Sequence, residues 1–76
     1  MISAAQVRMA RAALRFSVRQ LAELAGVADS TILRFETGRG AILATNLGRI
    51  QQTLEDGGVV FIPADAQGGP GVRLKA

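Results

Sequence analysis

Residues 17–38 read SVRQLAELAGVADSTILRFETG and predict two short helices joined by a tight turn. Ser17 and Gln20 have the spacing of a capping box, in which each side chain accepts a hydrogen bond from the other residue's backbone N–H. Phe16 and Leu21 occupy the two positions of a hydrophobic staple, which fixes the angle at which the chain enters a helix. The start of the first helix is therefore well defined.

The first of these helices is expected to run to about Ala25 and to bury Leu21, Leu24 and Ala25. Gly26 follows it, and glycine readily adopts the left-handed conformation found at the end of many helices. A turn of this kind lets the chain reverse direction within a few residues.

The second helix is expected over residues 29–37, with Gly38 ending it. At 100° per residue its two faces differ in character. The outer face comprises Asp29, Ser30, Leu33, Arg34 and Thr37. The inner face comprises Thr31, Ile32, Phe35 and Glu36. The inner face is apolar enough to be buried, and the outer face is short, polar and built around an arginine.

The rest of the chain predicts two further helices and a hairpin. Residues 3–14 are alanine-rich and amphipathic, and another helix starts near Thr45 as its N-cap and continues to Asp56. Residues 58–63 and 71–75 are β-branched or alternating runs typical of strands. The fold class is therefore mainly α, with four helices in residues 1–56 and a short C-terminal β-hairpin in residues 57–76. Because two strands alone are marginal, the hairpin must pack on the helices or pair with a second copy.

The amino-acid composition excludes several classes of function. The chain has 76 residues, which suits one small domain, and it has neither cysteine nor histidine. Disulfides, thiolate metal sites and the commonest general base are thus excluded. We expect no enzyme activity, no cofactor and no metal. No run approaches the length of a membrane span, so we expect a cytoplasmic protein.

The positive charge is concentrated in the helical part. Residues 1–49 carry seven arginines and three acidic residues, whereas residues 50–76 carry a net charge of −1. Arginine is suited to planar, bidentate contacts with phosphate or guanine. This distribution favours a nucleic acid as partner.

The spacing of five residues carries a resemblance to a known family. Small Ala22 follows Val18 where two helices cross closely, Gly26 makes the turn, and Ile32 and Phe35 bury the second helix. This resembles the helix-turn-helix pattern of the lambda-repressor-like, or XRE-type, DNA-binding family. The resemblance covers roughly residues 2–56, with the helix-turn-helix at about 18–37. The tail after it looks like that of a small bacterial subgroup.

The resemblance implies a transcriptional regulator, such as a repressor, that binds double-stranded DNA with the second helix in the major groove. Base contacts are expected from Asp29, Ser30, Leu33 and Arg34. Contacts with the DNA backbone are expected from Ser17, Arg19, Thr31, Thr37, Arg39, Thr45 and Asn46. Phosphate contacts position such a protein, and base contacts give it specificity.

Four residues of the predicted helices and their ends have expected roles beside these contacts. In the family, an arginine of the first helix often pairs with the glutamate that ends the recognition helix, and Arg11 and Glu36 match these positions. Relatives usually cap the recognition helix with serine or threonine, whereas this chain has Ala28. Asp29 beside it offsets the helix dipole or accepts a hydrogen bond from a cytosine amino group.

One short helix contacts few base pairs, so we expect a homodimer on a palindromic operator. The expected dimer interface or core comprises Val59, Val60, Phe61, Ile62, Val72 and Leu74. The alternative function is a protein-interaction module, such as an antitoxin or an adaptor, whose apolar tail binds a partner protein. Asp29, Leu33 and the uncapped helix favour that alternative, and the arginine distribution opposes it.

Overall fold

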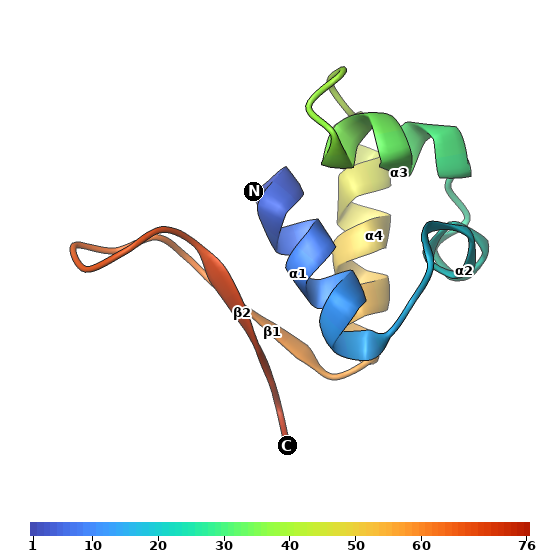
Figure 1. Cartoon of the computed structure of the whole chain (residues 1–76). Helices are drawn as coiled ribbons and strands as arrows, with labels where there is room; N and C mark the ends of the chain where they lie inside the picture. Colours follow the sequence, from blue (N-terminus) through green and yellow to red (C-terminus); the bar gives the residue numbers. More distant parts are fainter.

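The computed structural model describes all 76 residues and contains four helices followed by one antiparallel hairpin (Figure 1). The elements are α1 Ala4–Leu14, α2 Val18–Ala25, α3 Asp29–Glu36, α4 Ala44–Asp56, β1 Val59–Ile62 and β2 Gly71–Leu74. The predicted mainly α fold with a C-terminal hairpin is confirmed. No helix is both long enough and apolar enough to cross a membrane.

Capping boxes define the starts of α1 and α2. The Ser3 hydroxyl accepts from the Gln6 N–H at 3.1 Å, and the Gln6 side chain accepts from the Ser3 N–H at 2.9 Å. Ser17 and Gln20 repeat this arrangement at 3.0 and 2.9 Å. Each box satisfies two backbone donors that the first turn of a helix leaves free. These local bonds explain why two short helices begin where the sequence predicts.

All six elements contribute to one hydrophobic core or contact it. The largest fully buried side chains come from α1, α2, α3, α4 and β1; they are Val7, Leu21, Ile32, Ile50, Leu54 and Val59. In Figure 1, α1 and α4 lie next to each other, α3 crosses one end of this pair, and α2 packs on α3 and α4. The core therefore fixes the angle between α2 and α3.

The hairpin packs on α1 and α4, and its loop extends away from the helices (Figure 1). Val59 of β1 is only 1 % exposed and belongs to the core. The Gln6 amide on α1 donates to the carbonyl oxygens of Ile62 and Gly71 at 3.1 and 3.0 Å. One buried side chain thus links the first helix to both strands.

Two details of the helices differ from the sequence prediction. Leu24 is 62 % exposed, so the prediction that it is buried was wrong. α2 instead buries Leu21, Ala22 and Ala25, because small residues let it approach its neighbours closely. At 100° per residue, Leu24 lies roughly 110° from the centre of this buried arc.

The start of α4 was also predicted one or two residues late. Leu43 is the N-cap, no side chain caps this helix, and Thr45 lies inside its first turn. The buried residues Leu47, Ile50 and Leu54 set where α4 lies, so tertiary packing determines its start more strongly than a capping side chain does.

Candidate nucleic-acid interface

The turn between α2 and α3 is short and has a defined geometry. Gly26 adopts φ 69°, ψ 34°, and its N–H donates to the Ala22 carbonyl at 2.9 Å. Val27 is then buried, and Ala28 enters α3 with an extended backbone and no side-chain hydrogen bond. The absence of a capping side chain at residue 28 is therefore a feature of the structure as well as of the sequence.

The two faces of α3 are divided as predicted. Ile32 and Glu36 are buried, and Thr31 and Phe35 are half-buried. Every residue of the opposite face is exposed: Asp29, Ser30, Leu33, Arg34 and Thr37. Within residues 29–37, the exposed face thus combines a carboxylate, two hydroxyls, an apolar side chain and a guanidinium.

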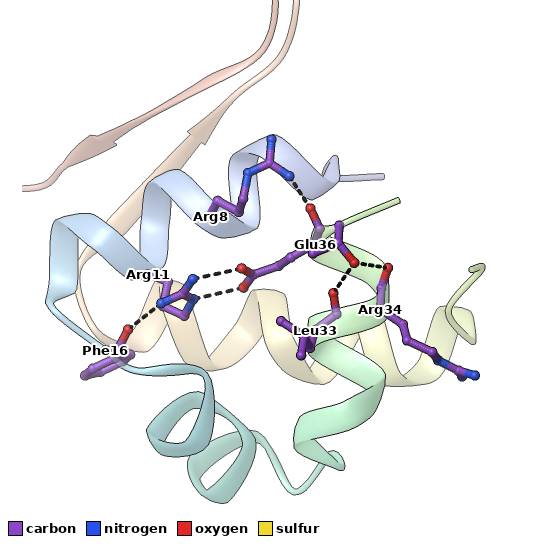
Figure 2. Close-up of polar contacts among 7 residues, drawn as sticks. Arg8, Arg11, Phe16, Leu33, Arg34 and Glu36 are labelled. Atoms are coloured by element: carbon purple, nitrogen blue, oxygen red, sulfur yellow. Dashed lines mark hydrogen bonds and ion pairs between the residues drawn. The ribbon is translucent and has the colours of Figure 1, made fainter. Parts of the chain in front are cut away.

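An ion pair holds the end of α3 against α1, as the family resemblance implied (Figure 2). Arg11 Nη2 lies 2.8 Å from Glu36 Oε1, and Arg11 Nε lies 2.9 Å from Glu36 Oε2. The Glu36 side chain is 3 % exposed and that of Arg11 is 25 % exposed. The pair is bidentate, which fixes the orientation of both side chains.

Further bonds extend this contact to the neighbouring chain segments. Arg11 Nη1 donates to the Phe16 carbonyl at 3.1 Å, at the entry to α2. Arg8 donates to the Glu36 carbonyl, at the end of α3 where the helix dipole favours a cation. The hydrogen bond to Glu36 raises the pKa of Arg11, which partial burial opposes. α1, the entry to α2 and the end of α3 are therefore joined by one polar cluster.

A hollow of about 480 Å³ lies between the starts of α2 and α3. It is lined by Ser17, Val18, Arg19, Asp29, Ser30 and Leu33. Residues predicted from the sequence as DNA-backbone contacts and residues predicted as base contacts thus meet on one surface. Val18 is the only lining residue that was not predicted as a DNA contact.

Arg34 is the most prominent charge on the exposed face. In Figure 2 its side chain points away from the Arg11–Glu36 pair, and no hydrogen bond or ion pair holds its guanidinium. The Thr37 hydroxyl, in contrast, donates to the carbonyls of Leu33 and Arg34 at 2.8 and 3.3 Å. Arg34 is therefore free to contact a ligand, whereas the Thr37 hydroxyl is already used within the helix.

Three other predicted backbone contacts follow α3 in the chain. Arg39 is exposed just after Gly38, and its N–H closes the end of the helix on the Arg34 carbonyl at 2.9 Å. Thr45 is exposed and Asn46 is half-buried in the first turn of α4. These residues carry polar or charged side chains on segments that immediately follow α3.

Comparison with known families decides what this arrangement is. A family model described as a helix-turn-helix domain matches residues 4–55, which include all four helices except the last residue of α4. The chain belongs to the helix-turn-helix domain family. This assignment agrees with the resemblance to the lambda-repressor-like proteins, and it indicates DNA binding. No match was found among the curated proteins.

The residues predicted for a dimer interface do not lie on one surface. Val59 is buried in the core of its own chain, and Phe61 and Val72 pack against that core, which is the core role that the sequence left open for them. Strand alternation places Val60 and Ile62 on the opposite face of the hairpin. Leu74 is 46 % exposed near the end of β2.

Proposed function

We propose that this helix-turn-helix protein is a sequence-specific transcriptional regulator that binds a palindromic operator as a homodimer. The observation that carries the proposal is the division of α3, whose inner face is fixed by the core and the Arg11–Glu36 pair. Its outer face is free of intramolecular side-chain bonds except at Thr37. A helix held in this way presents a constant set of side chains to the major groove.

In this proposal each side chain of the exposed face has a defined role. Arg34 donates to guanine O6 and N7, and Ser30 bonds a base edge or a phosphate. Leu33, which is 54 % exposed, contacts a thymine methyl group. Arg19 and Arg39 lie on either side of α3 and contact phosphates, which fixes the register of the helix on the duplex.

Asp29 sits at the edge of the hollow, with no basic side chain within ion-pairing distance. Its negative charge repels phosphate but stabilises the start of α3, which has no capping side chain. In the groove it accepts from a cytosine amino group, the donor that carboxylates contact in DNA. Asp29 therefore disfavours non-specific binding and favours sites with a cytosine at the matching position.

Mobility shift of the purified protein on its own upstream DNA, at two salt concentrations, tests the proposal. We expect a discrete complex that resists competitor DNA and whose affinity falls steeply as salt rises, because phosphate contacts release counterions. A complex that unrelated competitor DNA removes completely would contradict sequence-specific binding.

The hairpin gives a reason to retain a second function, that of a protein-interaction module. Val60, Ile62 and Leu74 expose apolar surface on an element that projects from the helical part (Figure 1). Deleting residues 57–76 is a poor test, because it removes the buried Val59 and would damage the core. Replacing Leu74, which is 46 % exposed on β2, by lysine is cleaner. Loss of a co-purified partner in this variant, together with unchanged DNA binding, would show that the hairpin binds proteins.

A further inference from the structure

The two strands of the hairpin leave both of their outer edges unpaired. β1 and β2 pair with Val60 opposite Arg73 and Phe61 opposite Val72. The Lys75 N–H donates to the Gly58 carbonyl at 2.9 Å, which continues the ladder by one pair. Antiparallel pairs alternate between bonded and non-bonded. The backbone groups of Val60 and Ile62 therefore point toward β2, and those of Val59 and Phe61 point outward.

No turn, loop or side-chain hydrogen bond engages the outward groups of Val59 and Phe61. The space beside this edge is open as well. Two hollows of about 320 Å³ each adjoin β1, and Phe61 lines both of them. The first is bordered by the end of α4 and by Lys75, and the second by Gln51 of α4 and by Met1, Ile2 and Gln6. A row of free N–H and C=O groups next to open space is a template for another strand.

We propose that β1 pairs antiparallel with β1 of a second copy, with Val60 at the centre. This inference rests on the homodimer proposed above and names its interface. The backbone N–H and C=O groups of Val59 then bond those of the partner's Phe61, and those of Phe61 bond those of the partner's Val59. This gives about four hydrogen bonds between the chains. Val60 lies directly opposite its own counterpart as a non-bonded pair, and the hairpins form one four-stranded sheet.

Charge distinguishes this edge from the one on β2. Self-pairing through β2 in the equivalent register, centred on Arg73, would place Arg73 directly opposite the partner's Arg73, and like charges so placed are destabilising. β1 carries no charge at all, because its sequence is VVFI. A second copy therefore fits β1 and is repelled from β2.

Pro63 and the charge on β2 limit the assembly to two copies. Pro63 follows Ile62 and has no N–H, so the row of donors on this edge ends at Phe61. Once two copies have paired, only the charged β2 edges remain at the ends of the sheet. The arrangement therefore closes as a dimer and does not extend into a fibre.

Cysteine cross-linking tests the register directly, since the natural chain has no cysteine. In a non-bonded antiparallel pair the two Cα atoms lie about 4.5 Å apart, within the range a disulfide spans. We expect full-length Val60→Cys to form a disulfide-linked dimer on mild oxidation. Arg73→Cys, which lies on the same face of the hairpin but on β2, is the matched control and should stay monomeric on a non-reducing gel.

A charge substitution gives a second, independent measurement. Val60→Lys places two ammonium groups opposite each other, and sedimentation should show the mass falling from two chains to one. Circular dichroism of the variant checks that the helices remain. Efficient cross-linking through Arg73→Cys with none through Val60→Cys, or a native protein that sediments as a monomer, would overturn the inference.

The same experiments separate this inference from the proposed function. A Val60→Cys dimer that cross-links but never binds DNA would support the interface and contradict the regulator. A protein that binds its operator as a dimer, yet cross-links only through Arg73→Cys, would support the regulator and contradict the interface.

Discussion

Arg11 and Glu36 are joined by two charge-assisted hydrogen bonds of 2.8 and 2.9 Å, and this contact ties α1 to the end of α3. The residues lie 25 positions apart in the chain. Because Glu36 occupies the inner face of α3, the pair determines which face of that helix remains available. An ion pair with no place in the proposed DNA contacts thus determines the orientation of the helix that makes them.

Removing either partner of this pair should destabilise the protein unequally. Arg11→Met leaves the carboxylate of Glu36 buried without a counter-charge, whereas Glu36→Gln leaves Arg11, which reaches solvent. We expect the free energy of unfolding to fall by about 2–4 kcal/mol in Arg11→Met and by about 1–2 kcal/mol in Glu36→Gln. Both values are below those of fully buried pairs, because Arg11 is partly exposed. Urea unfolding measures both, with the exposed Arg15→Met as control. Equal losses, or the reverse order, would show that burial does not determine the cost.

Two residues in the same left-handed conformation should respond oppositely to substitution. Arg15 has φ 59° and is the only residue other than glycine with a positive φ, and Gly26 has φ 69°. Arg15→Gly should stabilise the fold by about 0.5–1 kcal/mol and Gly26→Ala should destabilise it by about 1 kcal/mol, because only glycine avoids the Cβ clash. Arg15→Ala removes the charge but keeps the clash, so thermal unfolding of this variant separates the two causes. A gain in Arg15→Ala equal to that in Arg15→Gly would refute the backbone explanation.

Ala28→Ser should add the cap that α3 lacks. The backbone at residue 28 is already extended, as an N-cap requires, and nothing bonds its side chain. We expect a gain of about 1 kcal/mol in the free energy of unfolding. Ser17→Ala, which removes an existing cap from α2, should cost a similar amount. An Ala28→Ser variant no more stable than the native chain would mean that Asp29 already satisfies the start of the helix.

Gln6→Glu should loosen the hairpin without disturbing the start of α1. Glutamate still accepts from the Ser3 N–H, but it cannot donate to the carbonyls of Ile62 and Gly71. We expect the free energy of unfolding to fall by about 1–3 kcal/mol, and the backbone amides of β1 to exchange their hydrogens faster. Gln20→Glu changes the equivalent residue of the other capping box, which makes no such donation, and should be nearly neutral. If both variants behave alike, Gln6 does not anchor the hairpin.

The helix-turn-helix itself could be predicted because its signals are local. The capping box of Ser17 and Gln20, the glycine at residue 26 and the alternating faces of residues 29–37 each depend on neighbours within a few residues. The Arg11–Glu36 pair is a long-range contact, and only the resemblance to a family suggested it. Local chemistry thus defined the elements, and the resemblance supplied one contact between them.

The features that sequence reasoning missed depend on how the elements pack. Leu24 is exposed because α2 buries its alanine side. Val59, for which the sequence left a core role and an interface role open, is buried because the hairpin lies against α1 and α4. Gln6 caps α1 through local bonds, whereas its contact with the hairpin requires the strands at residues 62 and 71 to be near it. Arg8 lies three residues before Arg11 and so shares its face of α1, which is the feature of the sequence that indicates its contact with Glu36.

The most direct test of the proposed function is the base preference of the native protein compared with that of Arg34→Ala and Arg39→Ala. Selection of bound sequences from a random DNA library gives the preferred operator for each variant. We predict that Arg34→Ala loses its preference for guanine at one position of each half-site. Arg39→Ala should keep every preference, bind all sequences more weakly and lower the slope of log affinity against log salt by about 1. An unchanged base preference in Arg34→Ala would contradict the placement of α3 in the major groove.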